Sequence, residues 1–156
     1  MSEIGDSMMV VPMKDMNDLT FFGDVNGTTW TPYIFKLDYK DCRGILPGLV
    51  AKNKITKVIL PNTRLYGYKT ELAILLALPI QSVFVPSKMN NLDVATLCQA
   101  LTEPTSVVKE VEFEGHLDAY ASGCVRGMFN KLKATNDKDG TNNYIKVTFN
   151  KTDTQT

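Results

Sequence analysis

The sequence predicts an α/β protein in which a short, solenoid-like parallel sheet carries its helices on one side. Segments rich in β-branched and aromatic residues alternate with segments whose apolar residues recur at helical spacing, which is typical of successive strand–helix–strand units. One such strand–helix unit occurs twice in tandem, in residues 57–79 and 82–104. Polar residues alternate with apolar ones inside the strands, which gives each strand one buried face and one solvent-exposed face, called the dry face and the wet face below.

Composition and charge exclude several classes of protein. The chain has 156 residues, of which 44% are hydrophobic and 22% charged, and these values are close to the globular average. Its 17 basic and 17 acidic side chains cancel, so no overall positive field attracts a nucleic acid. The longest apolar stretch, residues 72–78, is about a third of the roughly 20 residues that span a bilayer. We therefore expect neither a nucleic-acid nor a membrane partner.

The cysteines and the N-terminus indicate the cellular compartment. The first six residues lack the basic segment of a signal peptide. Cys42, Cys98 and Cys124 are odd in number and far apart, which favours reduced thiols. The expected location is cytoplasmic or otherwise intracellular.

Six strands are predicted, the first two joined by a tight turn. Asn26-Gly27 accepts positive φ and is typical of a hairpin. Residues 1–27 would form an N-terminal hairpin or cap, residues 28–150 a single α/β domain with tandem units, and residues 151–156 a flexible tail. The predicted strands are residues 19–24, 28–39, 55–60, 80–85, 107–113 and 144–149.

Three helices are predicted between these strands. Apolar spacing indicates one over residues 68–78, where Pro79 ends it. A second, over residues 92–101, begins after Asn90 and has Asp93 in its first turn, where a carboxylate favours the helix dipole. The longest covers residues 117–133 and has the clearest amphipathic stripe. Residues 136–143 are expected to form a polar turn.

The strands of the tandem unit share the pattern apolar-x-x-apolar-x-apolar. It is formed by Ile55, Val58 and Leu60 in the first copy. Thr63 and Leu65 extend it toward L-x-x-L-x-L-x-x-N/C-x-L, so the segment resembles the leucine-rich repeat family. Further matches are Ile80, Val83, Val85; Val108, Val111, Phe113; Tyr144, Val147, Phe149; Ile34, Leu37, Tyr39, with Cys42 at the Asn position; and Met16, Leu19, Phe21.

That resemblance implies a solenoid with an open concave sheet face and helices on the convex side. Lys88 and His116 occupy positions where the family prefers Asn, so the family's internal hydrogen-bond ladder is not expected there. The alternative is a compact, doubly wound α/β domain. Central strands of such a domain read as nearly continuous apolar runs, whereas Lys57 and Ser82 interrupt the apolar residues here. The alternation favours the open sheet.

The first functional hypothesis is a non-enzymatic protein-interaction or assembly subunit. Its partner protein would dock on the wet face, with Ile59 and Phe84 as an apolar pair inside a charged rim. A second helical layer over both residues would remove this site. The full predicted face comprises Lys36, Asp38, Lys57, Ile59, Ser82, Phe84, Glu110, Glu112, Lys146 and Thr148.

The second hypothesis is a domain that binds a nucleotide or phosphate ligand, with or without enzymatic activity. Arg64 and Lys88 follow adjacent strands and precede helices, and ligands bind at this edge of open α/β sheets. No glycine-rich phosphate loop accompanies them. The candidate residues are Asn62, Thr63, Arg64, Ser87, Lys88 and Asn90.

No catalytic or metal-binding set is recognisable. His116 is the single histidine, which excludes sites that need two. On the predicted helix Cys124 is more than two turns from His116 and lies on the apolar stripe, so we interpret it as structural. Residues 137–140 lack the ligand spacing of a calcium loop. Neither a metal nor a cofactor is expected.

Overall fold

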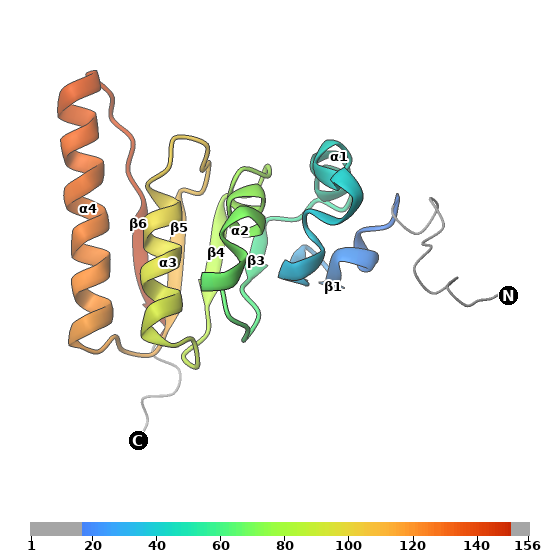
Figure 1. The fold of residues 1–156 in the computed structure, drawn as a ribbon, viewed down its shortest axis with the longest axis horizontal. Coiled ribbons are helices and arrows are strands. Elements are labelled where there is room, and N and C mark those ends of the chain that lie inside the picture. The colour runs from blue at the N-terminus through green and yellow to red at the C-terminus, as the bar shows by residue number, and fades with distance from the viewer. Residues whose placement is uncertain (1–16, 151–156) are drawn as a thin grey trace, which may run out of the picture.

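The computed structural model describes residues 17–150, which form a six-stranded sheet and four α-helices (Figure 1). The strands lie side by side in sequence order, the first pair antiparallel and the others parallel. Residues 1–16 of the expected cap and the expected tail 151–156 lie outside the described residues. The elements are β1 (Gly23–Asn26), β2 (Thr29–Pro32), α1 (Leu46–Lys52), β3 (Lys57–Ile59), α2 (Lys69–Leu76), β4 (Ser82–Val85), α3 (Asn91–Leu101), β5 (Glu110–Glu114), α4 (Ala119–Asp139) and β6 (Lys146–Asn150).

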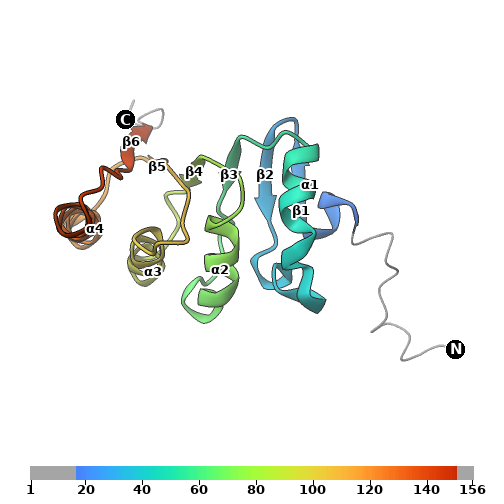
Figure 2. The same ribbon diagram turned by 90° about the horizontal axis from the view of Figure 1, so that it is seen from above.

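Helices α2, α3 and α4 lie on one side of the sheet, as the view from above shows (Figure 2), and α1 shares a hollow with α2 on that side. This arrangement confirms the predicted fold class, and together with the consecutive strand order it excludes the doubly wound alternative. Neighbouring strands are about 4.8 Å apart, whereas packed helices need about 8–10 Å. The sheet therefore lies on the inner side of a shallow arc and the helices on its outer side.

One row of buried side chains fixes the register of the strands. Trp30 pairs with Val58, Val58 with Val83, Val83 with Val111, and Val111 with Val147. The first four of these side chains have no exposed surface. Residues 57–59 pair with residues 82–84, the same displacement as the tandem repeat in the sequence.

The predicted helices form, and the structure shows what begins and ends them. Asn90 Oδ1 accepts a hydrogen bond from the Asp93 N–H at 2.9 Å and caps α3. Asp118 Oδ1 accepts from the Ala121 N–H at 2.8 Å and caps α4. This bond, with one from the Asn91 side chain, lowers the pKa of Asp118. The polar turn expected at residues 136–143 is wrong for its first half, because α4 continues to Gly140, whose φ of 69° ends it.

The predicted N-terminal hairpin forms at Asn26-Gly27, where β1 and β2 pair antiparallel and Gly27 has a φ of 64°, but the predicted bounds of its two strands are wrong. Residues 19–22 form a 3₁₀ turn in which Leu19 and Phe22, three positions apart, are both buried. The predicted strand 28–39 ends at Pro32, which has no N–H to donate to a neighbouring strand. Beyond it, Ile34 and Leu37 are buried with a period of three, and the chain continues through further 3₁₀ turns into α1, a helix that the sequence analysis did not predict.

Carboxylates tie the loops after β3 and β4 to the units that follow them. Asp93 Oδ1, on the first turn of α3, accepts from the N–H groups of Leu65 and Tyr66 at 2.8 and 3.2 Å. Glu114 Oε1, at the end of β5, accepts from the Ser87 N–H at 3.0 Å. These bonds hold the loops that follow β3 and β4 against the next unit of the solenoid.

We predict that Asp93→Ala lowers the free energy of unfolding by about 2–3 kcal/mol, because two backbone N–H groups lose a charged acceptor. Asp93→Asn keeps an oxygen at this position and should lose about 1 kcal/mol. Urea denaturation followed by circular dichroism measures both variants. Equal losses for the two substitutions would contradict the assigned role of the oxygen.

Candidate functional site

The wet face of the sheet is open in the structure. Along β3, β4 and β5 every second side chain is buried under the helices, and the residues between are half-buried. Among residues 17–150 no helix lies on this side of the sheet (Figure 2). The predicted face residues found there are Lys57, Ile59, Ser82, Phe84, Glu110, Glu112, Lys146 and Thr148.

Ile59 and Phe84 are direct register partners at the centre of this face. Lys57 reaches across Phe84: its Nζ lies 4.9 Å from the centroid of the Phe84 ring and 3.1 Å from Oε1 of Glu112 on β5. An ion pair this accessible contributes about 0–1 kcal/mol to stability, so a partner can displace it at little cost. The structure thus brings the predicted apolar pair together, with Phe84 beneath an ion pair that a partner can displace.

Two predicted face residues, Lys36 and Asp38, do not lie on the sheet, because β2 ends before them at Pro32. Lys36 Nζ instead donates to the backbone oxygen of Phe21 at 3.2 Å and lies 4.2 Å from the centroid of the Phe21 ring. Asp38 forms an ion pair of 3.1 Å with Arg43. Both residues stabilise the irregular segment beside the sheet, and their assignment to the face is corrected.

The alternative ligand residues follow β3 and β4 as expected but do not share a cavity. Asn62, Thr63, Arg64 and Lys88 are exposed, and Asn90 uses its side-chain oxygen to cap α3. Ser87 is the one member of the set that lines the 150 Å³ hollow between the ends of β4 and β5. This arrangement gives the second hypothesis little geometric support.

His116 and Cys124 do not form a reactive pair, because they line different hollows. Cys124 is half-buried and faces Cys98 across the α3–α4 contact. Burial, with a smaller contribution from Cys124, raises the pKa of the Cys98 thiol to about 12. Within residues 17–150 no cluster of three potential metal ligands occurs.

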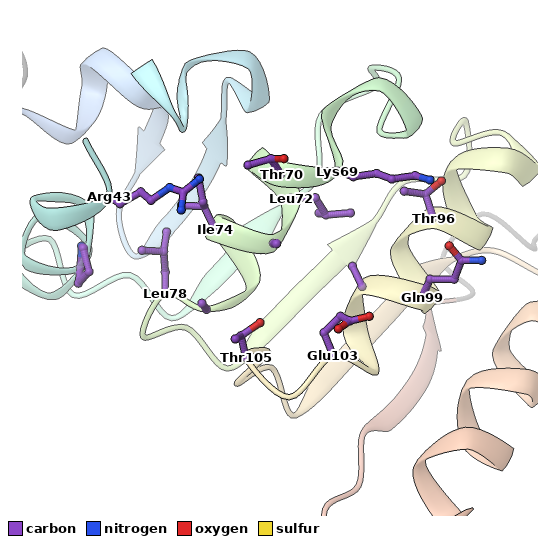
Figure 3. Close-up of a pocket in the computed structure, with 14 residues that line it drawn as sticks. Arg43, Lys69, Thr70, Leu72, Ile74, Leu78, Thr96, Gln99, Glu103 and Thr105 are labelled. Carbon is purple, nitrogen blue, oxygen red and sulfur yellow. The ribbon is translucent and has the colours of Figure 1, made fainter. Parts of the chain in front are cut away.

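A hollow of about 640 Å³ lies on the helical side of the molecule (Figure 3). One wall comes from Arg43, in the 3₁₀ turn before α1, and from Pro47, in the first turn of α1; the floor comes from α2. Gln99 and Glu103 form the opposite wall, at the end of α3 and just beyond it. Most of the lining is apolar, and charged side chains stand at the rim.

The hollow was not predicted from the sequence because α1, which forms one wall, was not predicted. Leu46, Leu49 and Val50 have helical spacing, and Pro47 lies in the first turn, where proline is tolerated. That signal was present in the sequence. The interpretation of residues 28–39 as one long strand left no separate helix to look for after it.

Comparisons with known proteins return no match, whether to a family model, a curated protein or a solved structure. A separate search over residues 17–150 finds no helix with the length and apolar character that a membrane span requires.

We predict that Cys98 does not react with thiol reagents in the folded protein. At pH 8 a pKa of about 12 leaves about one thiol in 10,000 as thiolate, and only the thiolate is nucleophilic. In a Cys124→Ser variant, the two remaining cysteines are buried. Ellman's reagent should then detect both thiols only after guanidinium is added. Rapid labelling of Cys98 without denaturant, located by peptide mapping, would contradict the packing of α3 against α4.

Proposed function

We propose that this protein is a non-catalytic interaction or assembly subunit that binds another protein through the open face of its sheet. The observation that carries the proposal is the half-exposed Ile59–Phe84 pair, which lies at the centre of a face that no helix of residues 17–150 covers. Binding energy in protein interfaces is concentrated in such central apolar residues, surrounded by a polar rim. Lys57 and Glu112 supply charges of both signs beside the pair.

The size of the face constrains how a partner binds. Six strands about 4.8 Å apart and three to five residues long present on the order of 400 Å². A stable interface buries about 800 Å² on each partner. The partner must therefore also contact the loops that border the face, and those after β3 and β4 are held in place by Asp93 and Glu114.

We further infer that the units built on β3, β4 and β5 are leucine-rich-repeat-like, which supports the same function. Ile55, Val58 and Leu60 are all buried, as the family pattern implies for its core positions. The exposed Thr63 occupies the position of the family's Asn. The hydrogen bonds to Asp93 and Glu114 hold the loops in place of those that the Asn would make. Solenoids of this kind use their open concave surface to bind partners.

The experiment begins with identification of the partner. A photo-reactive amino acid at position 84 is cross-linked in extract from the native cell, and the captured protein is then purified and its Kd measured by calorimetry. Phe84→Glu should raise that Kd at least thirtyfold, about 2 kcal/mol, and leave the circular dichroism spectrum unchanged.

The matched control is Phe35→Glu, because Phe35 is 60% exposed and lies outside the sheet. Its Kd should change less than about threefold. Equal losses for the two variants, or unfolding of Phe84→Glu alone, would overturn the proposal. A thermal shift of several degrees with a nucleotide, abolished by Lys88→Ala, would instead support the ligand-binding alternative.

A further inference from the structure

The last unit of the solenoid exposes apolar surface that the equivalent positions of earlier units bury. Val85 and Phe113 are register neighbours in the buried layer between sheet and helices. Phe149 continues their row on β6 and stacks on Phe113 with ring centroids 6.0 Å apart, yet it is 44% exposed. The dry side of the sheet therefore ends in an uncovered aromatic residue.

Helix α4 adds a second aromatic side chain to this end of the molecule. Cys124, Gly127 and Lys131 face α3, and Val125 lies on the buried stripe toward the sheet. At 100° per residue, Phe129 lies on the other side of that stripe, away from α3. It is 41% exposed and stands at the middle of α4.

The outer edge of β6 also presents backbone groups suited to strand pairing. The Lys146 N–H donates to the Lys109 oxygen at 2.8 Å, and the Asn150 oxygen accepts from the Gly115 N–H at 2.7 Å. Even-numbered residues of β6 therefore direct their backbone toward β5. In a parallel ladder the residues between them, Val147 and Phe149, direct theirs away from it. Among residues 17–150, β5 is the one strand that pairs with β6.

We propose that a second copy of this chain pairs with β6 in antiparallel orientation, about a two-fold axis at Thr148, and extends the sheet to twelve strands. In this register Val147 lies opposite Phe149 of the second copy, and Phe149 opposite its Val147. The outward backbone groups of the four residues then form four hydrogen bonds. The pairing also brings the exposed Phe149 and Phe129 of both copies into the dimer interface.

Charge complementarity favours a second copy over an unrelated strand. In the proposed register Lys146 lies opposite Asn150 of the second copy, and the next strand of that copy carries Glu114 beside this asparagine. No like charges oppose each other along the paired strands. The chain has no net charge, so two copies do not repel each other at long range. The small area predicts a weak dimer, with a Kd in the micromolar range.

Sedimentation equilibrium of the full chain between 5 and 200 µM tests the proposal. Val147→Pro removes an outward N–H, which an edge strand tolerates, and should weaken dimerisation at least tenfold. Circular dichroism checks that loss of the partly buried valine side chain leaves the monomer folded. Phe129→Glu should have a similar effect, whereas the exposed Phe35→Glu should change the Kd less than twofold. A monomer throughout this range, or a dimer that Val147→Pro leaves intact, would overturn the proposal.

Cysteine cross-linking tests the register directly. In a Cys124→Ser background, Thr148→Cys places two thiols on the axis, where opposed Cα atoms are about 4.5 Å apart and a disulfide can form. Lys146→Cys is the matched control, because its two copies would be about 13 Å apart along the strands. Mild oxidation should cross-link the first variant and leave the second monomeric. Equal cross-linking of both variants, or of neither, would refute the register.

Discussion

One row of side chains, buried from Trp30 on β2 to Val111 on β5 and partly buried at Val147 on β6, holds the five parallel strands in a single register. A slip of one residue in any strand would turn its buried side chains toward solvent and its polar ones toward the helices. Such a slip in β3 would bury Lys57 and expose Val58. Because the helices lie on one side only, this alternation also decides which side chains face outward. The carboxylates of Asp93 and Glu114 bind the loops after β3 and β4 and so hold successive units in the same register.

The parts of the fold that the sequence predicted are those in which local pattern and tertiary packing agree. The tandem unit could be found because Ile55 to Leu60 and its copy 25 residues later place apolar residues at the same positions, and the two strands pair with that displacement. The structure of residues 33–52 was not predicted correctly because Ile34 and Leu37 fit both a strand pattern and a 3₁₀ turn. Only packing against the remainder of the core distinguishes the two.

The candidate face could be predicted as far as the alternation of buried and exposed residues along each strand could be read from the sequence. Ile59 and Phe84 are neighbours as expected, since both belong to the tandem unit. The Lys57 bridge to Glu112 joins residues 55 positions apart and skips the intervening strand, so no local pattern reveals it. The same holds for the hollow beside α2, whose walls come from three separate segments.

The open face and the edge of β6 are different surfaces, so a dimer would leave the face free for a partner.

The measurement that tests the one-sided architecture most directly is the labelling rate of single cysteines along β5. In a Cys124→Ser background, cysteines are placed at Glu110, Val111 and Glu112. If one face of the sheet is open, positions 110 and 112 should react within minutes, and position 111 at least about a hundredfold more slowly, through unfolding alone. Equal protection at positions 111 and 112 would show that another part of the chain covers the face, and would contradict the account.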